Sequence, residues 1–272
     1  GNGPSDSPAI QTIMATHFDH AGDSRYYYSL WGHDYSYLGG PTGSSGIADL
    51  PGRAHLVTLG SFPGQTGTFS HQVGTFIHEF GHNLNQRHGG ANHDNYKPNY
   101  LSVMNYHYQL GGIGPTLLAK GFANTASGFD DFSYSHGLMS SLNESSLNES
   151  FGLGLGRSVD WNCNGTIQSS VAKDVQTANH CSASGSLSTL TDHDNWSSLQ
   201  ILTLGQAEPE AAICQTWEEH RPLHLELERL RRLGLLPPDG PVALPPPPQA
   251  GMNARTFVIH NDGGQPLSVT SM

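Results

Sequence analysis

No stretch of about 18 apolar residues occurs in the sequence, so we expect no transmembrane helix. Charge is also scarce, because Asp, Glu, Lys and Arg make up only 13% of the 272 residues, with 12 basic side chains against 23 acidic ones. The net charge of -11 argues against nucleic-acid binding, which usually needs a basic surface. With 36% hydrophobic residues, 33 glycines and 17 prolines, the composition favours a loop-rich globular protein with a modest core.

The first residues lack both an initiator methionine and an apolar signal core, so we expect the mature or excised part of a longer product. Cysteine is rare as well. Cys163 and Cys181 can form a disulfide if the protein is exported, which would leave Cys214 unpaired. Three reduced thiols are the alternative.

The hydrophobic pattern predicts strands at residues 25–31 and 55–59, each bounded by turn residues. Residues 71–84 change to three- and four-residue steps, which predicts a helix with one buried apolar face. The residues expected on that face are Val73, Phe76, Ile77, Phe80 and Leu84.

Leucines at helical steps predict a second helix over residues 207–233, stopped by Pro237 and Pro238. The proline run at residues 245–248 predicts a stiff linker, and the residues after it form a hairpin pattern. Earlier in the chain, Ser-Leu-Asn-Glu-Ser occurs twice in succession at residues 141–150, which favours either helical turns or capped loops.

The segment His-Glu-Phe-Gly-His-Asn-Leu-Asn-Gln-Arg-His covers residues 78–88. On a helix, His78 and His82 lie one turn apart on the same side, so their imidazoles can bind one ion. Glu79 lies beside them, where a carboxylate can take a proton from water without being a ligand. Catalytic zinc needs a third ligand, but a continuing helix would carry His88 about 9 Å further along the axis. The chain must therefore turn sharply before His88.

This segment resembles the metzincin signature H-E-x-x-H-x-x-G-x-x-H, which is followed by a Met-turn. Asn85 stands where the family has glycine, and after glycine Asn best tolerates the left-handed backbone that ends the helix. Residues 102–106, Ser-Val-Met-Asn-Tyr, resemble the Met-turn, in which Met104 would pack beneath the histidines. Tyr106 matches the tyrosine of astacin-like and serralysin-like members, whose hydroxyl approaches the metal or stabilises the tetrahedral intermediate.

The resemblance, to a bacterial metzincin of the extended multidomain type, implies an α+β fold. It consists of a twisted mixed sheet, an active-site helix and an irregular C-terminal subdomain that starts at about residue 90. We therefore expect a metzincin-like zinc protease domain at residues 9–206, a helical segment at 207–236, a Pro-rich linker at 237–254 and a truncated β-hairpin from another domain at 255–272.

The resemblance also implies a secreted or extracellular zinc metalloendopeptidase, cell-surface attachment included, that acts on protein or peptide substrates. Zinc would be bound by His78, His82 and His88, and Glu79 would deprotonate the zinc-bound water. The strand at 55–59 would be the upper edge strand, on which an extended peptide can pair. We expect a monomer. The alternative is a metal-binding, non-catalytic cell-surface or adhesion module derived from a protease.

A second metal pattern resembles the first half of a calcium loop, with oxygen side chains at alternate positions followed by glycine. Its residues are Asp160, Asn162 and Asn164, and Asp192 or Asp194 could supply the missing acidic ligand. An Asx-rich turn is the alternative. A disulfide between Cys163 within this loop and Cys181 beyond it would hold the region together, which favours an oxidising compartment.

Overall fold

The computed structural model of the chain describes residues 3–4, 7–18, 25–37, 40–129, 131–201, 210–240, 256–260 and 266–270. The helices in this part are α1 (Pro8–His17), α2 (Phe69–Asn83), α3 (Ile113–Ala119), α4 (Asn195–Ser198) and α5 (Trp217–Arg232), with 3-10 turns η2 (Pro63–Gln65) and η3 (His180–Ser182). The strands are β1 (Tyr28–Gly32), β2 (Ser36–Tyr37), β3 (Gly40–Pro41), β4 (Gly46–Leu50), β5 (Ala54–Thr58), β6 (Leu142–Asn143), β7 (Thr189–Leu190), β8 (Glu210–Ile213), β9 (Thr256–His260) and β10 (Pro266–Thr270). The chain is therefore α+β.

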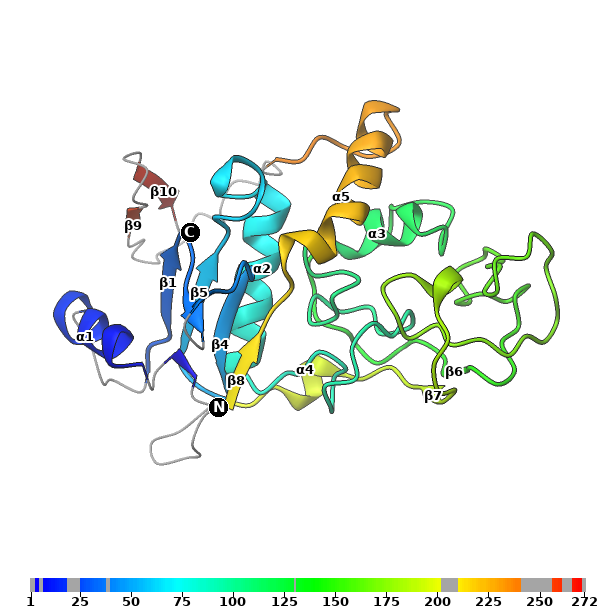
Figure 1. Cartoon of the computed structure of the whole chain (residues 1–272), viewed down its shortest axis with the longest axis horizontal. Coiled ribbons are helices and arrows are strands. Elements are labelled where there is room, and N and C mark those ends of the chain that lie inside the picture. Colours follow the sequence, from blue (N-terminus) through cyan, green and yellow to red (C-terminus); the bar gives the residue numbers. More distant parts are fainter. Residues whose placement is uncertain are drawn as a thin grey trace, which may run out of the picture.

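A mixed sheet with strand order β1-β5-β4-β8 forms one layer, and α2 packs against β4 and β5 (Figure 1). β1 is parallel to β5, whereas β4 is antiparallel to both β5 and β8. The expectation that residues 55–59 form the edge strand is wrong, because β5 lies between β1 and β4. All five residues of β5 are buried, and such a run indicates a covered strand without specifying its place in the sheet.

α2 is the helix that the apolar pattern predicts, but its apolar face is only partly buried. Phe76 is 38% exposed, whereas the most buried side is polar and carries His78 and His82. The rings of Phe76 and Phe80 lie along the sheet, each in edge contact with His55. α2 therefore packs against the sheet on one side and against the irregular part of the chain on the other.

Residues 84–201 contain only short regular elements and occupy the right of Figure 1. Their core surrounds the fully buried Trp161, whose ring lies 5.5 Å from that of Phe122. Other buried members are Tyr108, Ile113, Leu117, Leu142, Leu147, Leu153, Val159, Val175 and Leu190. The irregular C-terminal subdomain thus has a hydrophobic core of its own.

Two buried carboxylates organise these loops, one from each Ser-Leu-Asn-Glu-Ser repeat. Glu144 and Glu149 are fully buried, and their oxygens accept backbone N–H groups from distant loops. The donors are Trp161, Asn162 and Gln168 for Glu149, and Val175, Gln176 and Ser188 for Glu144, at 2.7 to 3.3 Å. Neither repeat forms a helix: the first contains the short strand β6, and the rest is turn and loop.

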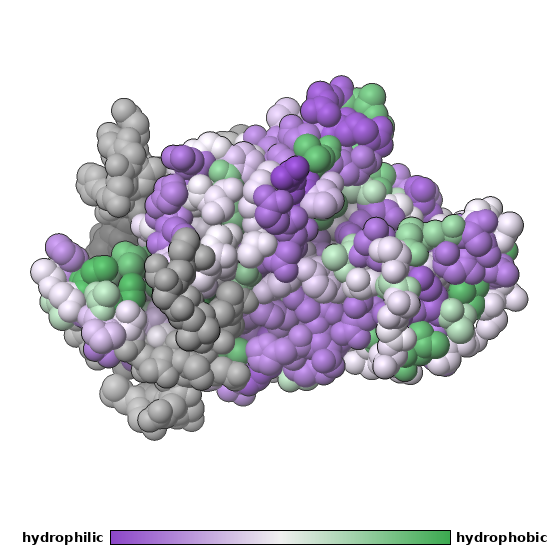
Figure 2. Space-filling view, in the orientation of Figure 1, coloured by the Kyte–Doolittle hydropathy of each residue, from purple (hydrophilic) through white to green (hydrophobic). Residues whose placement is uncertain are grey.

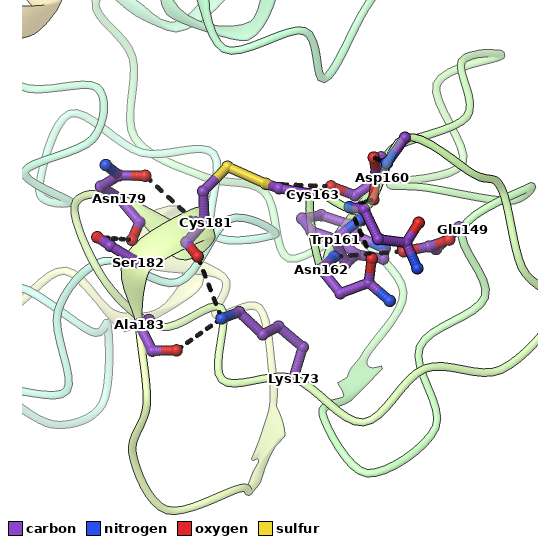
Figure 3. The surroundings of a disulfide bond; sticks show 12 residues. Glu149, Asp160, Trp161, Asn162, Cys163, Lys173, Asn179, Cys181, Ser182 and Ala183 are labelled. Carbon is purple, nitrogen blue, oxygen red and sulfur yellow. Dashed lines mark hydrogen bonds between the residues drawn. A yellow bond between two sulfur atoms is a disulfide. The ribbon is translucent and has the colours of Figure 1, made fainter.

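A disulfide joins Cys163 to Cys181, as expected, with their Cα atoms 5.4 Å apart (Figure 3). Beside it, Lys173 Nζ donates to the carbonyl oxygens of Cys181 and Ala183. The disulfide and this ammonium group connect loops that contain little regular structure. Cys214 carries a free, buried thiol.

The expected helix over residues 207–233 is wrong in its first part. Glu210–Ile213 form strand β8, and α5 begins at Trp217, after a capping box between Thr216 and Glu219. Helical leucine spacing does not begin until Leu223, so the pattern never covered the strand. Residues 202–209 lie outside the described residues.

The linker expected at 237–254 lies mostly outside the described residues, since 241–255 are not described. β9 and β10 pair antiparallel and form the expected hairpin. Among the described helices, none is both long and apolar enough to cross a bilayer. The visible face is largely hydrophilic, with apolar side chains showing at α1 and at the opposite end of the molecule (Figure 2).

Replacing the carboxylate of Glu149 by an amide tests its role in the loops. Glu149→Gln turns an NH2 donor toward a backbone N–H, so we expect the free energy of unfolding to fall by about 2 kcal/mol. Denaturant titration followed by tryptophan fluorescence measures the change. Glu218→Gln, at an exposed carboxylate, is the matched control and should leave stability unchanged. Equal stability of the two variants would contradict the structural role.

Candidate metal centre

The sharp turn required before His88 occurs at Asn85. Its φ of 67° is left-handed, a conformation that asparagine tolerates better than most residues other than glycine. Asn85 N–H donates to His82 O at 2.8 Å, and Gln86 N–H donates to Gly81 O at 2.9 Å. These bonds form a Schellman motif, which ends α2 and reverses the chain. His88 is thereby brought back beside His78 and His82.

Two backbone carbonyls determine which nitrogen of each helical histidine carries the proton. His78 Nδ1–H donates to Val103 O at 2.8 Å, and His82 Nδ1–H donates to Gln86 O at 2.7 Å. Since a carbonyl can only accept, the proton lies on Nδ1 and each Nε2 carries a lone pair. These are the outer hydrogen bonds that metal-binding histidines commonly make.

The three Nε2 atoms converge on one point. His82 Nε2 lies 3.0 Å from His78 Nε2 and 3.1 Å from His88 Nε2. Tetrahedral zinc with Zn–N bonds of about 2.05 Å separates its nitrogen ligands by about 3.3 Å. Burial lowers the pKa of all three imidazoles, that of His78 to about 4, which keeps the rings neutral and able to bind a metal. The donor set therefore fits zinc.

Glu79 is fully buried beside these rings. Neither of its oxygens forms a hydrogen bond with a well-aligned donor in the described part of the chain. Burial raises the pKa of this carboxyl well above its usual value, and the nearby Cys214 thiol opposes the rise only in part. A Cβ at Gly46 would overlap Glu79 Oε1 and Leu56 O, so β4 approaches the carboxylate closely only because this residue is glycine.

Met104 packs against α2. It is fully buried with Tyr100 and Tyr134, and a Cβ at Gly81 would overlap its sulfur. Gly81, the residue before His82, therefore allows the thioether to approach the helix backbone. The same turn supplies Val103 O, which orients His78.

Tyr106 also lies at the histidine cluster. Its ring centroid is 4.6 Å from that of His88 and 5.9 Å from that of His78. Burial raises the pKa of the phenol well above its usual value, with smaller contributions from the charges of Cys214 and Glu79. The hydroxyl therefore keeps its proton and can act as a hydrogen-bond donor.

Sequence reasoning missed a fourth donor, Cys214. Its sulfur lies 3.7 Å from His82 Nε2, although the two residues are 132 positions apart. Burial, and then the charge of Glu79, raises the pKa of the thiol well above its usual value. A bound cation would reverse this, because a coordinating thiol is deprotonated. In the sequence the only signal was that Cys214 had no cysteine partner.

In the described residues, two other groups bring three His or Cys side chains close enough to hold one metal ion. In the first, His71, His220 and His224 meet between α2 and α5, but Thr68 N–H donates to His71 Nδ1. The proton of His71 is then on Nε2, so neither nitrogen offers a free lone pair. The second is Cys163 and Cys181 with His180, and its two sulfurs are already joined to each other.

The candidate calcium loop closes on itself through Asx turns. Asp160 accepts the N–H groups of Asn164 and Gly165 at 3.1 and 2.7 Å. Asn162 Oδ1 also accepts from Asn164 N–H, and Asn164 Oδ1 accepts from Thr166. The alternative expected from the sequence, an Asx-rich turn, is therefore present.

Asp192 and Asp194 have structural partners elsewhere. Asp192 accepts from the Ser135 hydroxyl at 2.8 Å, and Asp194 caps α4 by accepting from Ser197 N–H at 3.1 Å. Neither belongs to a group of three His, Cys, Asp or Glu donors in the described chain. Calcium binding at this loop stays a prediction that the structure does not strengthen.

A cavity of about 380 Å³ begins beside Tyr106 and continues under the start of α5. Its walls include Tyr96, Lys120, Gln215 and Glu219. Burial lowers the pKa of Lys120 to about 8. Both polar and apolar side chains thus line this space, which Tyr106 separates from the histidine cluster.

Comparison of the chain with family models, with curated proteins and with solved structures found no match. The metzincin resemblance therefore depends on the residues of the chain itself.

Asn85 provides a test of the turn. In Asn85→Ala, the Cβ of an ordinary residue in a left-handed conformation should lower the free energy of unfolding by about 1 kcal/mol. Zinc binding, measured by competition with a chromophoric chelator, should weaken along with it. Asn85→Gly is the matched control and should bind zinc as the wild type does. An alanine variant that binds zinc as tightly as the glycine variant would rule out the turn as the constraint on His88.

Proposed function

We propose that this protein is a zinc endopeptidase of the metzincin type, secreted or extracellular, that hydrolyses protein or peptide substrates. The observation that carries the proposal is Glu79. A fully buried carboxylate without a well-aligned donor is costly to keep, and here it lies beside three histidines whose Nε2 atoms converge. A general base for metal-assisted hydrolysis must lie beside the metal ligands without being one of them, as Glu79 does.

Zinc at His78, His82 and His88 would supply a Lewis acid that polarises the scissile carbonyl and makes water more acidic. Glu79 takes a proton from the attacking water and passes it to the leaving amine. The Tyr106 phenol donates a hydrogen bond to the carbonyl oxygen as negative charge develops there. The cavity beside Tyr106 is available to a substrate side chain.

A second candidate function is a non-catalytic metal-binding module. Cys214 favours it, because structural zinc sites have four protein ligands whereas catalytic sites keep one position open. The buried carboxylate of Glu79 favours the enzyme, because a purely structural site has no use for it. The disulfide suits an oxidising compartment under either function.

Glu79→Gln separates the two functions. If Glu79 is the general base, hydrolysis of a quenched peptide by the zinc-loaded protein should fall by about 10³-fold, since general bases contribute 10² to 10⁴. Zinc content should stay the same, because Glu79 is not a ligand.

Glu218→Gln is again the control. Undiminished hydrolysis by the Glu79→Gln variant would overturn the mechanism. Freshly purified wild-type protein without stoichiometric metal would overturn the site.

A further inference from the structure

Strand β8 covers the side of β4 that would otherwise be the edge of the sheet. The register pairs Ile47 with Ile213 and Leu50 with Glu210. The contact continues past the strand, because Cys214 N–H donates to Gly46 O at 3.3 Å and Ser45 N–H donates to Gln215 O at 2.8 Å. The chain thus runs antiparallel to β4 along its length and on past the metal site.

An extended peptide binds to a sheet by adding to its edge strand through main-chain hydrogen bonds. Without β8, that edge would be β4, whose Gly46 lies against Glu79. The proposed substrate and β8 therefore need the same backbone groups.

Cys214 immediately follows β8 and points its sulfur at the histidines. The four donor atoms of His78, His82, His88 and Cys214 lie within 4.8 Å of one another. A tetrahedral zinc with Zn–S of about 2.3 Å places sulfur about 3.6 Å from each nitrogen ligand. The observed distance to His82 Nε2 is 3.7 Å.

The thiol is also held in place by its own backbone. Ser44 Oγ donates to Cys214 O at 2.7 Å, and Thr216 pairs with Ser44 as an isolated bridge. From Thr216 the chain enters α5, whose Leu227 and Leu230 are buried against Leu118. The chain after Cys214 is thus anchored by Thr216 and α5, whereas before Cys214 it is held by the pairing of β8 with β4.

We propose that Cys214 is a fourth metal ligand and that β8 occupies the peptide-binding edge, so that the chain as described is a closed form of the enzyme. This inference rests on the proposed function and adds its regulation. Opening exchanges the thiolate for water without any redox step: the metal–sulfur contact is lost, and the released thiolate takes up a proton. The same movement frees β4 for a substrate backbone.

Cobalt substitution tests the ligand without reference to activity. The other two cysteines form a disulfide, so a thiolate-to-cobalt charge-transfer band in the full chain can arise only from Cys214. We expect that band in the wild type and its loss in Cys214→Ala, while the visible d–d bands show that cobalt is still bound. Bound cobalt without the band in the wild type would overturn the assignment.

Peptide hydrolysis by the zinc-loaded full chain tests closure. If nine-tenths of the wild type is closed, Cys214→Ala should be about tenfold more active. A double variant, Ala211→Pro with Ala212→Pro, should also be activated, because successive N–H groups along a strand point to opposite sides and one of the two must face β4. This variant tests the proposal even if Cys214→Ala does not fold. Leu225→Ala, at a side chain 60% exposed on α5, is the control and should match the wild type.

The outcomes separate the two proposals. A cobalt–thiolate band together with no hydrolysis by any variant would refute the endopeptidase and support the fourth ligand. A wild type that is as active as Cys214→Ala and shows no band would refute closure and support the endopeptidase.

Discussion

Two carbonyl oxygens, Val103 O and Gln86 O, determine which nitrogens the candidate metal centre can offer to an ion. By accepting from the Nδ1 of His78 and His82, they leave both Nε2 lone pairs directed at one point. Gln86 O follows the left-handed turn at Asn85, and Val103 O precedes Met104, which is buried against Gly81. The chain reversal after α2 and the turn beneath the helix therefore act together. They position the imidazole rings of His78 and His82 and hold the proton of each ring on Nδ1.

The irregular half of the molecule holds these two turns in place with little regular secondary structure. Glu144 and Glu149 each gather backbone donors from loops far along the chain, as a strand ladder would otherwise do. A buried carboxylate offers four acceptor sites, so one side chain can satisfy several N–H groups that have no other partner. The disulfide adds a covalent constraint to the same region.

Local features of the site could be predicted from the sequence, and distant ones could not. The histidine spacing follows from helix geometry, whereas the metzincin resemblance is what pointed to Asn85 and Met104. In the structure the histidine Nε2 atoms converge, Asn85 is left-handed and Met104 is buried. Cys214 is 132 positions from His82, and only the pairing of β8 with β4 brings it to the site. The strand at 55–59 was wrongly placed at the edge because another pairing, that of β1 with β5, covers its second side. The deep burial of the histidine side of α2 was not predicted, because apolar spacing identifies one buried face and gives no sign of a second.

The covalent continuity of β8 with the rest of the chain has a consequence for competition. An occupant tethered to the site acts at an effective concentration of roughly millimolar order, whatever the concentration of the protein. Dilution therefore does not open the site, and a free peptide must exceed that effective concentration or bind more tightly than the tether. Under the closed form proposed here, the protein would select substrates by their ability to displace part of its own chain.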